Sequence, residues 1–151
     1  MNNNKIVVFG GSGFIGSHVA DYLSEAGYEV FIYDIIDSPY LRPDQQIILG
    51  DILDSEKLNK VTKNAKAVFH FAALAFLDDA MDKPIKTVEV NLLGTLKILE
   101  ACLQNGVNRF IYASTVYVHS REGGFYRCSK KAAEDYVEEY NKIFGLNYTV
   151  L

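Results

Sequence analysis

The sequence of 151 residues contains no tryptophan, only two cysteines and only three prolines. Cys102 and Cys128 are too few for a disulfide framework, and they do not have the spacing of a metal-binding pair. No apolar run approaches the roughly 20 residues that a transmembrane helix needs. Met1 is followed by polar asparagines rather than by the apolar segment of a secretion signal. These absences disfavour a membrane-spanning protein and a disulfide-rich extracellular domain, and we expect a cytoplasmic protein.

Clustered positive charge is also scarce. The longest basic run is the pair Lys130 and Lys131, and the net charge of -4 is spread along the chain. Because nucleic acids and anionic membranes attract clustered basic residues, the sequence predicts neither as a partner. His18 and His119 share no ligand spacing with a carboxylate or a cysteine, so we expect no bound metal. His70 lies in an apolar segment, and we expect it to be packed in the core without an acid–base role.

Short apolar segments alternate with segments of helical periodicity along the whole chain. The apolar segments are residues 6–9, 30–33, 47–49, 67–71, 110–113 and 148–151. The helical segments are residues 12–26, 54–64, 84–105 and 126–144. This alternation is typical of an α/β fold with a doubly wound parallel sheet, and right-handed crossovers favour the strand order 3-2-1-4-5-6. The chain ends within the sixth strand, so we expect residues 1–151 to be one truncated domain whose substrate-binding part lies beyond Leu151.

A glycine-rich loop follows the first apolar segment. In VVFGGSGFIG, Gly10, Gly13 and Gly16 fit a dinucleotide-binding spacing, and Gly11 with Gly13 and Gly16 fits the commoner variant. Glycines between a strand and a helix let a pyrophosphate approach the backbone N–H groups at the positive end of the helix. Asp34 ends the second strand, where its carboxylate would accept from a ribose 2'-hydroxyl and repel a 2'-phosphate. The loop and Asp34 together predict a Rossmann fold that binds NAD in preference to NADP.

Tyr126 and Lys130 are four residues apart at the start of the last helical segment. Residues with this spacing lie on the same face of a helix, so the ammonium can sit beside the phenol. At about 5 Å and an effective dielectric constant of about 20, the charge would favour the phenolate by about 3 kcal/mol. We therefore expect Lys130 to lower the pKa of Tyr126 toward neutral pH. Gly123 and Gly124 allow a sharp turn into this helix.

These features resemble the extended short-chain dehydrogenase/reductase family, and within it the NAD-dependent nucleotide-sugar epimerases and dehydratases. The resemblance covers essentially the whole chain and includes the segments GDILD, FHFAALA, VEVNLLGTLKILEAC and RFIYAST. It implies cofactor contacts from the following residues: Gly10, Gly13, Phe14, Ile15, Gly16, Asp34, Asp51, Ile52, Phe71, Ala72, Ala73, Asn91 and Lys130.

The resemblance also implies a catalytic set of Thr115, Tyr126 and Lys130, with Ser114 as the second choice for the hydroxyl. Tyr126 would take a proton from a sugar hydroxyl, Lys130 would tune the phenol and hold the ribose, and Thr115 would bind the reacting oxygen. Members of the family usually carry some two dozen residues between the hydroxyl and the tyrosine. Here Thr115 and Tyr126 are only 11 apart, which leaves the substrate less certain than the cofactor.

The favoured interpretation is an NAD-dependent nucleotide-sugar epimerase. A reductase or dehydrogenase of the same family, and a dinucleotide-binding regulator without activity, remain alternatives. A 4,6-dehydratase is disfavoured, because relatives with that activity follow the threonine with an Asp-Glu pair, whereas Val116 and Tyr117 follow Thr115. We also expect a homodimer through helices 84–105 and 126–144. The apolar residues that suggest it are Leu96, Leu99, Tyr136, Tyr140 and Phe144.

Overall fold

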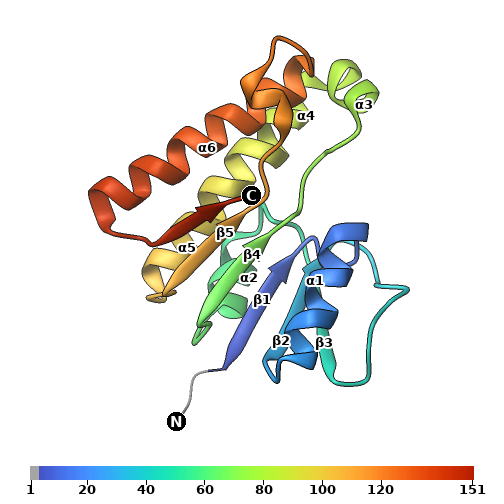
Figure 1. Cartoon of the computed structure of the whole chain (residues 1–151), viewed down its shortest axis with the longest axis vertical. Helices are drawn as coiled ribbons and strands as arrows, with labels where there is room; N and C mark the ends of the chain where they lie inside the picture. The colour runs from blue at the N-terminus through green and yellow to red at the C-terminus, as the bar shows by residue number, and fades with distance from the viewer. Residues whose placement is uncertain (1–3) are drawn as a thin grey trace.

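A computed structural model describes residues 4–151, and it contains one parallel sheet with helices on both faces (Figure 1). The six strands are β1 (Lys5–Phe9), β2 (Glu29–Asp34), β3 (Gln45–Leu49), β4 (Ala67–His70), β5 (Arg109–Tyr112) and β6 (Tyr148–Val150). They lie in the order β3-β2-β1-β4-β5-β6, and all neighbouring strands are parallel. The predicted fold and strand order are confirmed.

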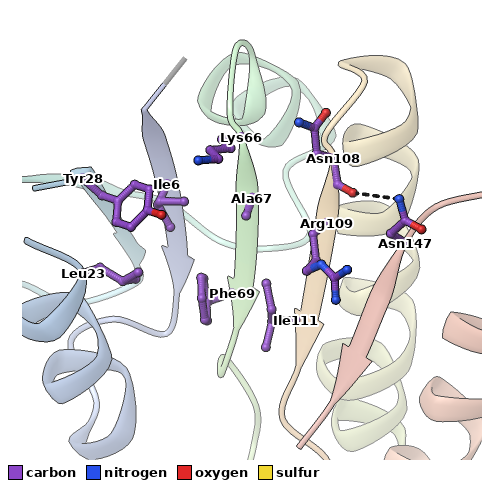
Figure 2. A pocket seen from close by; sticks show the side chains of 10 residues that line it. All are labelled: Ile6, Leu23, Tyr28, Lys66, Ala67, Phe69, Asn108, Arg109, Ile111 and Asn147. Atoms are coloured by element: carbon purple, nitrogen blue, oxygen red, sulfur yellow. Dashed lines mark hydrogen bonds between the residues drawn. The ribbon is translucent and has the colours of Figure 1, made fainter. Parts of the chain in front are cut away.

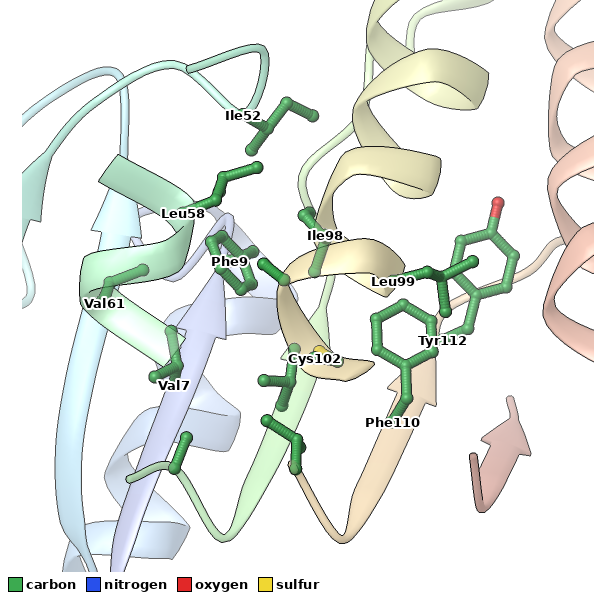
Figure 3. Close-up of a cluster of buried hydrophobic side chains, with 14 of the residues drawn as sticks. Val7, Phe9, Ile52, Leu58, Val61, Ile98, Leu99, Cys102, Phe110 and Tyr112 are labelled. Atoms are coloured by element: carbon green, nitrogen blue, oxygen red, sulfur yellow. The ribbon is translucent and has the colours of Figure 1, made fainter. Parts of the chain in front are cut away.

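The helices form two layers because successive side chains of a strand point to opposite faces of the sheet. Val7 and Phe9 of β1 pack in the larger core, beneath α2 (Ser55–Thr62), α5 (Thr95–Gln104) and α6 (Gly124–Phe144) (Figure 3). Ile6 and Val8 pack in a smaller core with Ala20 of α1 (Phe14–Glu25). Full burial of one such aliphatic or aromatic side chain stabilises the fold by about 1.5–3 kcal/mol.

The predicted helix 84–105 is confirmed as a helical region but is not uniform. It consists of α4 (Pro84–Val88), the π-helical turn η1 (Glu89–Gly94) and α5. The sequence does not predict the π-helical turn, because the periodicity of apolar residues does not distinguish a π-helical turn from an α-helical one. Two short elements were also not predicted, α3 (Leu77–Asp82) and the 3-10 turn η2 (Val116–His119), since one or two turns are too short to show a period.

One residue of the predicted dimer contact is misplaced. Leu99 is fully buried in the larger core, so the expectation that it contributes to a subunit interface is wrong. Tyr136 and Phe144 of α6 are exposed, with 46% and 58% of their surface accessible. Ile85 of α4 is 76% exposed. Apolar surface therefore remains on these helices without Leu99.

An open cavity of about 490 Å³ lies on the α1 face of the sheet, at the amino ends of β4 and β5 (Figure 2). It is lined by Ile6, Leu23, Tyr28, Lys66, Ala67, Phe69, Asn108, Arg109, Ile111 and Asn147. None of the predicted cofactor or catalytic residues lines it. Doubly wound proteins bind their ligands at the opposite, carboxyl edge of the sheet, which is where the glycine loop lies.

Candidate active site

The glycine loop packs directly against the segment that follows β4. Gly10 has φ +77°, and a Cβ atom there would lie 2.4 Å from the nitrogen of Ala72. A Cβ atom on Gly16 would lie 2.2 Å from the carbonyl oxygen of Gly10. Real Cβ atoms do not approach backbone atoms this closely, so both positions require glycine. The two glycines thus let α1 begin immediately against the end of β1.

The amino end of α1 is open to a ligand. Its N-cap is Gly13, and no side chain caps the helix. The first N–H groups of a helix lack partners within the helix, and they carry the positive end of its dipole. A phosphate is the group that such a helix end accommodates best. Phe14 and Ile15 stand in this first turn and are 78% and 59% exposed.

Asp34 lies at the carboxyl end of β2 and is held by backbone donors. Its Oδ2 accepts a hydrogen bond from Ser12 N at 3.0 Å, and its Oδ1 accepts from Ile35 N at 2.7 Å and from Ile36 N at 3.4 Å. A carboxylate can accept about four hydrogen bonds, so the capacity to accept a hydroxyl remains. The glycine loop therefore fixes the position of the carboxylate that the sequence assigns to the ribose.

A cavity of about 520 Å³ joins these parts at the carboxyl ends of the strands. Eight of the predicted cofactor residues line it: Gly10, Gly13, Asp34, Asp51, Ile52, Phe71, Ala72 and Ala73. The sequence argument did not single out the rest of the lining, which is Tyr33, Ile35, Ile36, Gly50, Phe76, Lys86 and Val90. The position of Ile35 and Ile36 directly after Asp34 could have indicated them. Phe76 comes from a segment whose folding the sequence does not specify, and Lys86 comes from the predicted helix 84–105, where helical periodicity does not mark it as a cavity residue.

Tyr33 and Lys86 shape this cavity in different ways. The hydroxyl of Tyr33 donates to the carbonyl of Asp51 at 2.9 Å, which ties the end of β3 to β2. Lys86 brings a basic side chain to the lining, and its Nζ lies 3.5 Å from Glu89 Oε2. The expected preference for NAD over NADP stays a prediction.

Asn91 is not among the residues that line the cavity, although the resemblance assigns it to the cofactor site. It is 1% exposed, and its amide bonds Leu74 and Ser129. Its direct contact with a cofactor stays a prediction. Through these hydrogen bonds, Asn91 connects the segment that follows β4 to α6.

Tyr126 lies in the first turn of α6, which begins at Gly124 (φ +48°) after its N-cap Gly123 (φ +89°). Thr115 follows β5, and its hydroxyl accepts a hydrogen bond from Tyr117 N at 3.4 Å. Burial raises the pKa of Tyr126, while the nearby Thr115 hydroxyl acts in the opposite direction. The chain thus brings the predicted hydroxyl near the predicted base, despite the short segment between them.

Lys130 does not tune Tyr126 in the way the sequence suggests. Its side chain is 3% exposed, and its Nζ lies over the ring of Tyr112, 4.1 Å from the centre. Burial lowers the pKa of Lys130 to about 7, and the charge of Glu134 acts in the opposite direction. The pKa of Tyr126 is raised rather than lowered, because burial dominates and Lys130 is directed into the sheet.

His70 is 1% exposed, and its Nε2 lies 2.9 Å from the hydroxyl of Thr95. Burial lowers its pKa well below the ordinary value, and the nearby Lys130 charge lowers it further. His70 is therefore neutral and packed in the core near neutral pH. Within residues 4–151 no three His, Cys, Asp or Glu side chains gather as a metal site requires. No described helix is both long enough and apolar enough to cross a membrane.

The fold and the cavity define the class of this domain: a doubly wound Rossmann-type domain whose ligand cavity lies at its glycine loop. A sequence profile of the NAD dependent epimerase/dehydratase family matches residues 6–151, and the chain belongs to this family. A UDP-glucose 4-epimerase from Rhizobium meliloti is 35% identical over 76% of this chain and 36% of that protein. The relatives also include a dTDP-D-glucose 4,6-dehydratase from Dictyostelium discoideum.

Two solved structures are similar over nearly the whole chain. UDP-glucose 4-epimerase from Thermotoga maritima, solved with UDP-glucose, has a TM-score of 0.91 and is 31% identical over 97% of this chain. The Thermus thermophilus UDP-glucose 4-epimerase, solved with NAD, has a TM-score of 0.87 and is also 31% identical over 97% of this chain. The chain covers 54% and 53% of those two proteins. It therefore spans about half of their length.

Proposed function

We propose that this chain binds NAD at the carboxyl edge of its sheet, as the cofactor half of an enzyme that epimerises a nucleotide sugar. The observation that carries the proposal is the shared cavity: the glycine loop, Asp34 and the segment after β4 line a single space. The NAD complex of the Thermus thermophilus relative supports the cofactor, and the UDP-glucose complex of the Thermotoga maritima relative supports the substrate class.

The residues present fit the cofactor. The uncapped amino end of α1 at Gly13 would hold the pyrophosphate, and Asp34 would accept from the adenosine ribose. Asp51 and Ile52 line the part of the cavity that the family resemblance assigns to the adenine. When bound, NAD supplies a group that accepts and returns a hydride.

The chain itself would supply position and proton transfer. Tyr126 is the base that takes the proton from the sugar hydroxyl, and Thr115 holds the same oxygen by a hydrogen bond. With its raised pKa, the Tyr126 phenol needs a nearby positive charge to act near neutral pH, and the oxidised nicotinamide of bound NAD would supply one. Lys130, one turn further along α6, is the basic residue that would hold the ribose. In hydride transfer between a sugar and NAD, the protein contributes the positioning of the reactants and the transfer of protons.

A binding measurement tests the cofactor assignment in the chain as it stands. Calorimetric titration with NAD should give saturable one-site binding. NADP should bind at least tenfold more weakly, because its 2'-phosphate would meet the Asp34 carboxylate. Equal or tighter binding of NADP would overturn the assignment of Asp34. Absence of binding to either dinucleotide would overturn the proposed function.

A second candidate is dinucleotide binding without turnover. The short segment between Thr115 and Tyr126 favours it, because a loop of this length encloses less of a sugar than the family's usual one. A dehydrogenase that releases NADH is the third possibility. Steady-state absorbance at 340 nm in the complete protein separates them: a dehydrogenase accumulates NADH, an epimerase converts substrate without accumulation, and a binding module does neither.

A 4,6-dehydratase is the less favoured enzyme. Water loss from the sugar needs an extra acid and base near the catalytic hydroxyl, and the residues after Thr115 are Val116 and Tyr117. Formation of a 4-keto-6-deoxy sugar by the complete protein would contradict this preference.

A further inference from the structure

Lys130 has an unusual environment for a buried cation. It is 3% exposed, and among residues 4–151 no oxygen accepts a hydrogen bond from its ammonium. The group it faces is the ring of Tyr112 on β5, whose centre lies 4.1 Å from Nζ. An ammonium over the face of an aromatic ring is attracted by the ring quadrupole, and the attraction is larger when both groups are desolvated.

The ring rather than the hydroxyl of Tyr112 makes this contact. The hydroxyl is buried and has no hydrogen-bond partner among the described residues. Phe110, two residues earlier on β5, stacks on Tyr112 with ring centres 6.3 Å apart and planes 15° apart. The ring of His70 lies 5.8 Å away on β4. Tyr112 is fully buried between them, so its face is held fixed beneath the ammonium.

The other titratable groups around Lys130 are few. Glu134 lies one turn further along α6, and its charge raises the lysine pKa. His70 on β4 is neutral, and Tyr126 lies one turn earlier on α6. Burial opposes the charged lysine most strongly. Tyr112 therefore supplies the closest favourable interaction that the charged ammonium has.

We propose that Tyr112 is a positioning residue. The face of its ring, at the carboxyl end of β5, holds the Lys130 ammonium and favours the charged form of the lysine. This inference rests on the proposed function for its catalytic meaning, since a charged lysine matters to turnover only if Lys130 holds the ribose of bound NAD. The contact between Tyr112 and Lys130 does not depend on the proposed function. The contact requires an aromatic ring at position 112, but it does not require the tyrosine hydroxyl.

The direct test is an NMR titration of Lys130 in the 151-residue chain, following its side-chain Cε and Nζ resonances with pH. Tyr112→Phe keeps the ring and should leave the lysine pKa unchanged within about 0.3 pH units. Tyr112→Leu removes the ring and should lower this pKa by about 0.5–1.5 pH units, since such contacts at desolvated sites are worth about that much. Phe9→Leu is the control, because Phe9 on β1 is equally buried but contacts neither Lys130 nor the ring of Tyr112.

If Tyr112→Leu does not fold, a second variant at the same position provides the test. Pentafluorophenylalanine at position 112 keeps the shape of the ring and reverses its quadrupole, so it should lower the Lys130 pKa as Leu does. An equal pKa in the Phe and pentafluoro variants would overturn the proposal. So would a fall of the same size in Phe9→Leu, because that result would assign the effect to packing.

Activity of the complete protein gives an independent readout. Tyr112→Phe should retain the wild-type pH profile of kcat, and the pentafluoro variant should move the basic limb that depends on charged Lys130 to lower pH. Unchanged profiles in both would contradict a positioning role. If the NMR titration behaves as expected while no variant or wild-type protein shows turnover, the contact is established and the proposed function fails instead.

Discussion

The side-chain amide of Asn91 on η1 donates a hydrogen bond of 3.0 Å to the hydroxyl of Ser129 on α6. The same amide holds the backbone of Leu74, accepting from its nitrogen at 2.7 Å and donating to its oxygen at 3.1 Å. Ser129 in turn donates to the carbonyl of Tyr126 at 2.8 Å. Asn91 therefore joins the segment that follows the cofactor cavity to the helix turn that carries Tyr126 and Lys130.

Asn91→Ala should lower the free energy of unfolding by about 2–4 kcal/mol, because it leaves both backbone groups of Leu74 without their partner. Urea unfolding measures this change. Asn108→Ala, at an exposed position, is the control and should stay within about 0.5 kcal/mol of wild type. A loss below about 1 kcal/mol at Asn91 would show that water replaces the amide at little cost.

The stability of the chain should depend on pH through Lys130. Its pKa is about 7 in the folded chain and 10.5 in the unfolded one, so between these values the unfolded state binds more protons and stability rises with pH. Lys130→Met removes the buried charge. At pH 6 the variant should be more stable than wild type by about 2–5 kcal/mol, and the gap should shrink as the pH rises toward 10.

Chemical unfolding of both proteins at several pH values checks this prediction. The comparison isolates Lys130 best above pH 7, where His70, whose pKa the Lys130 charge also lowers, is neutral in both proteins. A gap that stays constant from pH 6 to pH 10 would mean that Lys130 is charged at all these values and is better solvated than the structure shows.

Asp34→Ala should weaken NAD binding by roughly ten- to a hundredfold, since a hydrogen bond to a charged acceptor is worth about 1.5–3 kcal/mol. The preference over NADP should shrink with it, because the repelling charge is gone. Asp37→Ala is the matched control: Asp37 is exposed in the same loop and does not line the cavity. Calorimetry on the two variants tests the assignment, and equal effects of both would contradict it.

The complete protein should be a homodimer through α4, α5 and α6. Tyr136→Arg would place a charge among the exposed apolar residues of these helices and should yield monomers in sedimentation velocity at micromolar concentration. Tyr22→Arg on α1, at an exposed tyrosine outside these helices, is the control and should leave the dimer intact. A monomeric wild-type protein would contradict the prediction.

The sheet could be predicted because its strands read directly from the sequence. Central parallel strands are buried on both faces, so β1 reads as an uninterrupted apolar run up to the glycine loop. Asp34 was found because it ends such a run. Phe76 could not be found in this way, because it precedes α3, which is too short to show a period. Lys86 lies in the predicted helix 84–105, but helical periodicity does not show which polar residue faces a ligand.

The contact of Lys130 is the clearest limit of the sequence argument. A spacing of four residues places Lys130 on the same face of α6 as Tyr126, but it does not fix the torsions of a long side chain. The desolvated ring of Tyr112 decides where the ammonium goes, and Tyr112 belongs to another element. Likewise, the hydrogen bonds of Asn91 in η1 to Leu74 and Ser129 join segments that are distant in the sequence, so no local pattern records them.

The most direct test of the central claim is the turnover of Tyr126→Phe in the complete protein with a nucleotide-sugar substrate. Phe keeps the ring volume and removes the proton acceptor, so kcat should fall by about 10²- to 10⁴-fold while NAD affinity stays within about twofold. Tyr136→Phe, on the exposed side of the same helix, should leave both unchanged. Wild-type turnover in Tyr126→Phe would contradict the assignment of the base and leave dinucleotide binding as the function of this chain.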